Sequence, residues 1–474
     1  MPVEPKSITF FKLRSLYDLV LGLHPHASHS ASSLLLWDIL KETIECLMAR
    51  LEPLDSRNTT EVDLIRRYGE IGDNLHSYLG FLEAGEANRI PSVIVSPLQD
   101  MMGSQAPDPQ VVVWCSWLPS NYSVPPTLGM HLKKTVSDVF DDPKHRVVRQ
   151  VPEVLAAVSF PAAERDNVLL HSALGHELGH VLVAYKHDID KYQKKSKVRL
   201  EERYLIEASK MSDSTDDAAE SGSGSLPLTD QTKYELLSGV ALRVTINWLN
   251  ELLSDAYSVY FLGPAPVLSL HYLRGINGPS VTHPPGCLRF PLMLECLRRS
   301  GFREASDPDL GWLAPRIAEI ESACPDDPGY TDPVYRTVFS CLKSHQSSIA
   351  KYIMRLGRSR GAGTRKKAYT YSDWCSLYSA QPTSSGTRNA LVDRILNYVI
   401  PDTIESDGNG AELANLPSIL NSGWAVFYGY WDQFCSGLEA SDLTGQHMAR
   451  QKLFNLLLKA IEAVDLKRRW ENSQ

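Results

Sequence analysis

The sequence predicts an α+β protein in which helices dominate. Apolar residues recur at three- and four-residue spacing over several long stretches, as in amphipathic helices, and the clearest of these are residues 31–52, 57–84 and 331–357. Between them lie short runs that are rich in β-branched and aromatic residues and bounded by proline, at 89–97, 110–119 and 154–161. These runs predict a small mixed sheet. Long amphipathic helices and few strands together define the fold class.

The composition is that of a globular protein with an acidic balance. The chain has 474 residues, enough for two or three domains, and 43% of them are hydrophobic. Its formal net charge is −8. Such a chain has no overall basic field to attract nucleic acid, so we expect no nucleic-acid partner.

The cysteines and the N-terminal stretch indicate the cellular compartment in which the protein is expected. The eight cysteines are scattered and form no CxxC pair, which is typical of reduced thiols in a cytosol-like compartment. Lys12, Arg14 and Asp18 interrupt the first apolar stretch, which favours an amphipathic helix over a signal peptide. No apolar run approaches the roughly 18 to 20 residues that span a bilayer. We therefore expect a cytoplasmic protein without a membrane span.

Changes in composition along the chain predict three regions. Residues 1–90 form an N-terminal helical region, and residues 91–357 form a central domain. A basic, glycine-containing stretch begins at residue 358 and introduces a C-terminal helical region, 358–474. Its helical patterns lie at 388–399, 411–437 and 443–468. Within the central domain, residues 207–230 are mostly polar and lack the apolar content that offsets ordering entropy, so we expect a mobile insertion there.

One apolar stretch, "HSALGHELGHVLVAYKHD", carries four histidines and a glutamate. His176 and His180 are four positions apart, so on a helix both imidazoles project from the same face, about one turn apart. This geometry suits two ligands of one zinc ion. Glu177, between them, is placed to act as a general base on a metal-bound water. The alternative is an ordinary buried helix that carries histidines.

The other two histidines of this stretch are not expected to bind the same ion. His171 falls on a different face of the helix, and His187 lies about 10 Å further along the axis. We expect both to pack, to cap the helix or to line the cleft.

A third ligand is available further along the chain. A catalytic zinc ion usually has three protein ligands and keeps a fourth position for water. Glu251 and Asp255 are four apart in the strongly apolar segment "NELLSDAYSVYFLGP", and carboxylates that face a core need partners. If Glu251 ligates zinc, Asp255 can accept the free ring N–H of a ligating histidine and fix its tautomer. A solvated helix face is the alternative.

The order of these motifs resembles the gluzincin class of metallopeptidases, which includes thermolysin, the ImmA/IrrE proteins and the HtpX and CAAX prenyl protease group. The segment "SDAYSVYFLGP" is also similar to the one that follows the third ligand in ImmA/IrrE proteins. The resemblance implies a zincin-like catalytic domain at residues 91–357, with an active-site helix from about 163 to 190. It implies the following roles: His176, His180 and Glu251 as ligands of one Zn²⁺ per chain, Glu177 as general base, and Asp255 as the partner of a ligand.

The segment "THPPGCLRFPLML" carries a further match. His283 and Arg289 resemble the His-Pro-Pro-x-x-x-Arg segment of the HtpX and CAAX group, which also follows the third ligand. The prolines predict a rigid turn for His283 and place Arg289 in the first turns of a helix. Both side chains can then act in one catalytic cleft, where His283 is suited to donate to a developing oxyanion. A helix-capping loop with a structural arginine is the alternative.

The sequence differs from these families in two respects. The resemblance covers roughly residues 150–300, and members of the HtpX and CAAX group carry membrane spans, which this sequence lacks. A prenylated or intramembrane substrate is therefore not implied. The gap from His180 to Glu251 is also much longer than in ImmA/IrrE proteins.

These residues predict a zinc metalloendopeptidase-like hydrolase that acts on a peptide or protein substrate. In zincins the substrate lies extended along a sheet edge, which "VLAAVSF" or "SVIVS" can supply here. The first alternative is a zinc-binding regulatory or protein-interaction module with little or no turnover. The presence of Glu177 argues against it, because a structural zinc site needs no base. A metal-free helical interaction protein is a third possibility, and the oligomeric state stays open.

Overall fold

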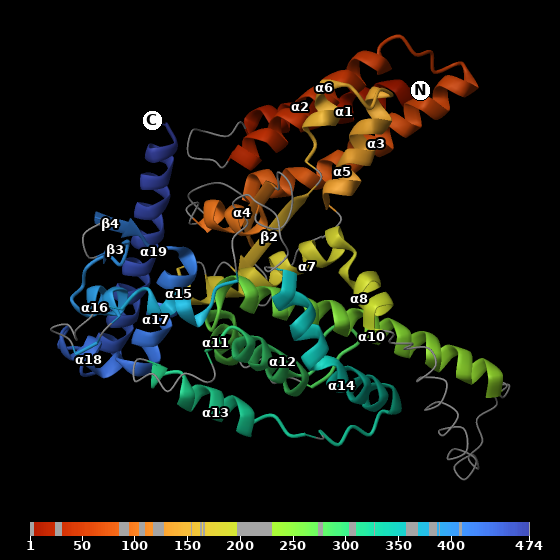
Figure 1. Cartoon of the computed structure of the whole chain (residues 1–474). Coiled ribbons are helices and arrows are strands. Elements are labelled where there is room, and N and C mark those ends of the chain that lie inside the picture. The colour runs from red at the N-terminus through yellow and green to blue at the C-terminus, as the bar shows by residue number, and fades with distance from the viewer. Residues whose placement is uncertain are drawn as a thin grey trace. The chain divides into compact units, whose positions relative to one another are not determined.

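The part of the chain that the structure describes is helix-rich, with two small sheets (Figure 1). The computed structural model describes residues 4–23, 31–84, 94–103, 110–116, 128–152, 154–161, 164, 166–196, 230–273, 278–302, 310–326, 328–356, 368–378, 386–387, 389–406 and 410–473. The predicted insertion at 207–230, apart from its last residue, and the basic stretch that begins at residue 358 lie outside these residues. The helix-rich α+β class is confirmed.

The chain divides into two compact units. Unit 1 comprises Met1–Val168 and Asp465–Gln474, and unit 2 comprises Leu169–Val464. The last helix, α19 (Leu443–Ser473), therefore begins in unit 2 and ends in unit 1. The division at residues 90 and 357 rests on composition and stays a prediction.

Three long helices of unit 1 pack against one another, as their amphipathic patterns predict: α1 (Pro5–Gly22), α2 (Ala31–Leu51) and α3 (Thr59–Ala84). Leu40 and Leu47, which are two turns apart on α2, are fully buried in their shared core. Trp37 Nε1 donates a 2.7 Å hydrogen bond to the carbonyl oxygen of Val20 on α1. Shorter helices of this unit are α4 (Val95–Gly103), α5 (Leu128–Phe140) and α6 (Arg146–Gln150).

Unit 1 also contains a parallel pair of strands, β1 (Gln110–Ser116) and β2 (Leu155–Pro161). Gln110 is paired with Leu155 and Ser116 with Pro161. Both strands coincide with predicted runs. Parallel strands need a long crossover connection, and α5 and α6 lie between these two strands in the chain.

The strand expected at 89–97 is wrong where the structure describes it. Val95 is the first residue of α4, and Pro97 lies in the first turn of this helix. Proline is tolerated there because the first N–H groups of a helix have no partner within it. The described part of unit 1 thus has a parallel pair instead of a mixed sheet, and "SVIVS" does not supply a substrate-binding edge. For the edge of β2 this role stays a prediction.

Unit 2 is built mainly from helices. Besides the start of α19, its described helices are η3 (a 3-10 helix, Val168–Ala173), α7 (Leu174–Lys186), α8 (Asp188–Ser196), α10 (Asp230–Leu262), α11 (Ala265–Tyr272), α12 (Gly286–Arg299), α13 (Ala314–Ser322), α14 (Pro333–Leu356), α15 (Tyr371–Cys375), α16 (Ala390–Leu396), α17 (Leu416–Gly429) and α18 (Trp431–Ser436). An antiparallel pair, β3 (Thr403–Ser406) and β4 (Gly410–Leu413), was not predicted, so the helical pattern expected from residue 411 is wrong at its start. No helix in the described ranges is long and apolar enough to cross a membrane.

The long helix α10 is the centre of unit 2. It packs against α7, α12, α14 and α17. Trp248, Leu252 and Tyr257 along this helix are fully buried, so it is surrounded by neighbours on several sides. A helix in this position can bring polar side chains to the core only where other buried polar groups meet them.

α7 and α10 touch through their backbones. A Cβ atom added at Gly179 of α7 would lie 2.7 Å from the Cα of Ser254 on α10, and one at Gly175 would lie 2.8 Å from a methyl group of Leu262. Larger residues at these two positions would push the helices apart, because the interior is close-packed. Glycine therefore allows the close approach that lets both helices contribute to one site.

The helix that carries His176 and His180 is shorter than the range of about 163–190 that was expected for it. The 3-10 helix η3 precedes α7, which starts at Leu174 and ends at Lys186. His187 follows with a left-handed φ of 51° and is the C-cap residue. A residue in this conformation ends a helix, because the backbone turns away from the helical path.

Candidate metal centre

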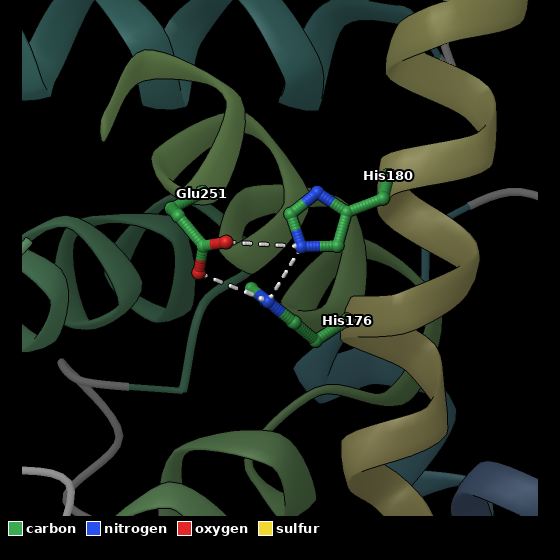
Figure 2. A group of neighbouring side chains, drawn as sticks. All are labelled: His176, His180 and Glu251. Atoms are coloured by element: carbon green, nitrogen blue, oxygen red, sulfur yellow. Dashed lines mark hydrogen bonds and ion pairs between the residues drawn. The ribbon is translucent and has the colours of Figure 1, made fainter. Parts of the chain in front are cut away.

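The side chains of His176, His180 and Glu251 meet where α7 packs on α10 (Figure 2). The Nε2 atoms of the two imidazoles are 3.0 Å apart. Glu251 presents one oxygen to each ring: Oε2 lies 3.3 Å from His176 Nε2, and Oε1 lies 3.2 Å from His180 Nε2. All three ligand atoms lie within 4.8 Å of one another. The three residues predicted as metal ligands thus form one group.

A buried ion pair supports the first histidine. Asp255 lies one turn after Glu251 on α10, and its Oδ1 is 2.8 Å from His176 Nδ1. Arg289, in the first turn of α12, holds the same carboxylate through two hydrogen bonds of 2.8 Å and 2.7 Å. The Nδ1–H of His176 is thereby engaged by Asp255, and its Nε2 faces Glu251.

Burial and the neighbouring charges shift the pKa values of these groups in opposite directions. Burial lowers the pKa of His176, but the carboxylates of Asp255 and Glu251 outweigh it and raise this pKa to about 10. Burial raises the pKa of Glu251, but the imidazoles of His176 and His180 outweigh it and keep this pKa well below its usual range. The pKa of Asp255 is lowered in the same way, because Arg289 and His176 outweigh burial. Both carboxylates are therefore ionised at neutral pH, and a metal ion bound at the group would replace the ring proton that the raised pKa keeps on His176.

Glu177 lies beside the group but does not belong to it. Its side chain is buried on α7. Burial raises the pKa of Glu177 above its ordinary value, against the attraction of His176, His180 and Arg289. A carboxyl group with a raised pKa gains and loses its proton nearer to neutral pH, which suits general acid–base work.

His283 lies on the turn that precedes α12, next to the same group. Its Nε2 is 3.8 Å from Glu251 Oε1, and its side chain is 63% exposed, so it can be reached from solvent. Trp248 of α10 stabilises this turn, because its Nε1 donates a 2.8 Å hydrogen bond to the carbonyl oxygen of Ser280. The hydroxyl of Thr282 lies 2.8 Å from His283 Nδ1. His283 and Arg289 therefore approach Glu251 and Asp255 from one segment, and their predicted catalytic roles stay predictions.

The residues present fit a metal ion. Imidazole nitrogens and a carboxylate oxygen are common ligands of transition metals. Glu251 Oε2 is buried and makes no hydrogen bond to any residue that the structure describes, although buried polar atoms normally have a partner. A bound cation would satisfy this oxygen. Within the described ranges no fourth histidine, cysteine or carboxylate joins the group.

His171 and His187 stay outside the group, as their spacing predicted. His171 is buried in η3, and His187 is the exposed C-cap residue of α7. They fill two of the roles expected for them, packing and capping.

One residue of the site was not predicted from the sequence. Ser254 immediately precedes Asp255 on α10, and its Oγ lies 3.0 Å from His180 Nδ1. The position three after Glu251 shares a helix face with it, which is a weak signal. A serine in a helix can also bond only to its own backbone, so this spacing alone does not single it out.

Comparisons of the chain with protein-family models, with curated proteins and with solved structures find no match. The likeness to gluzincins therefore rests on the motifs and on the geometry of these side chains. Function has to be argued from the site itself.

We expect Asp255→Asn to weaken the binding of added zinc about 10- to 100-fold, the usual cost of losing the partner of a metal ligand. Asparagine has the same size, but it lacks the charge that holds the His176 N–H and pairs with Arg289. Competition with a chromophoric chelator measures the dissociation constant. Asp188→Asn is the matched control, because Asp188 is a buried carboxylate whose hydrogen bonds come from Tyr257 and Tyr352. Equal affinity in both variants would reduce Asp255 to a packing role.

Proposed function

We propose that this chain is a zinc-dependent metallopeptidase of the gluzincin type, with a zincin-like catalytic domain built around α7 and α10. The observation that supports this most strongly is the meeting of His176, His180 and Glu251, with Glu177 next in the chain to the first of them. A zinc site that only stabilises a fold is normally closed by four protein ligands and needs no base. Three donors beside a buried glutamate fit a catalytic site better than a regulatory module without turnover.

The chain's own residues divide the chemistry between them. When bound, zinc supplies Lewis-acid chemistry, polarising a carbonyl group and acidifying water. His176, His180 and Glu251 would hold the ion. Glu177 takes a proton from the attacking water and gives it to the amine that leaves when the peptide bond breaks. Its pKa is raised towards neutral pH, where a carboxyl group can both take up a proton and give it away.

His283 and Arg289 have different roles in this proposal. The Thr282 hydroxyl lies 2.8 Å from Nδ1 of His283, and we propose that it donates to this nitrogen. The ring proton is then on Nε2, where it can be donated to the negative oxygen that develops on the scissile carbonyl. Arg289 pairs with Asp255 and acts on the site through it. We therefore assign the oxyanion contact to His283 and a positioning role to Arg289.

On this assignment, His283→Ala should lower kcat about 10²- to 10³-fold, the cost of losing one oxyanion donor, with zinc retained. Zinc is retained because His283 is not in the group of three. Measuring kcat, zinc content and melting temperature on one preparation separates this role from a structural one. A lower melting temperature with intact kcat would remove His283 from the active site.

The proposal as a whole is tested by removing and restoring the metal. Wild-type protein treated with a chelator should lose the ability to cleave a quenched-fluorescence peptide library, and about one equivalent of zinc per chain should restore it. His176→Ala, treated in the same way, should show no restoration. Zinc-loaded wild-type protein that cleaves no peptide of the library would favour the regulatory module instead.

A further inference from the structure

Ser254 is a fully buried serine between two residues of the candidate site. Its Oγ lies 3.0 Å from Nδ1 of His180 and 2.9 Å from the carbonyl oxygen of Asn250, one turn earlier on α10. The first contact reaches a candidate ligand on another helix. The second stays within α10.

The number of protons fixes the direction of these hydrogen bonds. A carbonyl oxygen only accepts, so the single proton of the Ser254 hydroxyl goes to Asn250. The hydroxyl oxygen then accepts from His180, and Nδ1 of that ring must carry the ring proton. In the neutral imidazole, Nε2 of His180 then keeps its lone pair for a metal ion. This nitrogen lies 3.2 Å from Glu251 Oε1 and 3.0 Å from Nε2 of His176.

We propose that Ser254 is a positioning residue that presents the imidazole of His180 to the metal ion. It does for His180 what Asp255 does for His176, with a neutral hydroxyl in place of a carboxylate. Two adjacent residues of α10 would thus orient the two histidines of α7. This inference rests on the metal site in the proposed function.

The packing of the two helices explains why a residue of this size occupies the position. A Cβ atom at Gly179 would come within 2.7 Å of the Cα and 3.0 Å of the Cβ of Ser254, so the helices touch at this point. A longer acceptor such as asparagine would need space that this contact does not provide. Serine supplies an acceptor for the ring with a single heavy atom beyond Cβ.

The test compares two serines of α10 that lie one turn apart. Ser254→Ala removes the acceptor, and the helix tolerates it because alanine is smaller and a better helix former. Ser258→Ala is the matched control: Ser258 is also fully buried and packs near Gly175, but its hydroxyl donates to the carbonyl oxygen of Asp255. We expect the zinc dissociation constant to rise about 10- to 100-fold in Ser254→Ala and to stay at the wild-type value in the control.

Cobalt gives a second readout, which a change in stability alone would not move. The visible absorption bands of bound Co²⁺ depend on ligand geometry, so they should shift in Ser254→Ala and not in Ser258→Ala. Ser254→Gly lacks the same hydroxyl and should raise the zinc dissociation constant by the same factor, although glycine also lowers the stability of the helix.

Three outcomes would count against the inference or its basis. Wild-type affinity and spectrum in Ser254→Ala would overturn it. A large difference in zinc affinity between Ser254→Ala and Ser254→Gly would overturn it too, because the effect would then come from packing. Failure of the wild-type protein to bind either metal would overturn the metal site itself.

Discussion

Glu177→Gln is expected to reduce peptide cleavage about 10²- to 10⁴-fold while zinc stays bound. Glutamine keeps the shape of the side chain, but its amide cannot take up a proton from water. The ligands are untouched, because Glu177 is outside the group of three. The melting temperature should stay near that of the wild type, since a neutral amide costs less to bury than a carboxylate. The rate of cleavage and the zinc content per chain are measured on the same sample.

Glu319→Gln is a suitable control for this substitution. Glu319 is a half-exposed residue of unit 2 whose carboxylate pairs with Arg316 on the same helix, α13. The Glu319→Gln variant should cleave peptides at the wild-type rate. Undiminished cleavage by Glu177→Gln would assign the activity to another site or to a contaminant.

His180→Asn and Glu251→Ala should each abolish zinc binding, from about one ion per chain to nearly none. Two remaining ligands cannot hold the ion against water, and asparagine at 180 is too short to replace an imidazole. Elemental analysis after dialysis measures the zinc content. Glu251→Ala with its full zinc content would show that another residue is the third ligand.

His187→Asn controls for the loss of a histidine near α7. His187 is exposed and lies outside the group, and its φ of 51° is one that asparagine adopts readily. This variant should bind zinc as the wild type does. Loss of zinc here would mean that damage to the end of α7 alone is enough to disturb the site.

The sequence predicted the three candidate ligands that the structure brings together, but not all the contacts around them. Four-residue spacing on a helix is enough to put His176 and His180 on one face. A carboxylate pair in an apolar helix needs partners, which is why Glu251 and Asp255 could be named. The carboxylate of Asp255 contacts both His176 and Arg289. This depends on how α7, α10 and α12 cross. Spacing along a chain does not contain that information.

The prediction of the fold was best for long elements. The amphipathic pattern of α2 or α3 repeats over many residues, so chance matches average out. A run of a few β-branched residues does not distinguish a strand from the first turn of a helix, and the expected strand at 89–97 failed for this reason. The hairpin of β3 and β4 carried a usable signal, because Asp-Gly-Asn-Gly at 407–410 is typical of a tight turn.

Gly179 brings the backbone of α7 onto Ser254 of α10, so the separation of the candidate ligands is set by helix contact and not by the chain that joins the helices. The entropy of closing a loop grows slowly with its length, and each doubling costs only about 0.6 kcal/mol. Residues 197–229 join α8 to α10 in the sequence. For any connection that behaves as a loop, a change in length should therefore change the free energy of unfolding little and leave the geometry of the candidate ligands unchanged. The number of residues between the second and third ligands is then a poor criterion for finding such sites in other sequences.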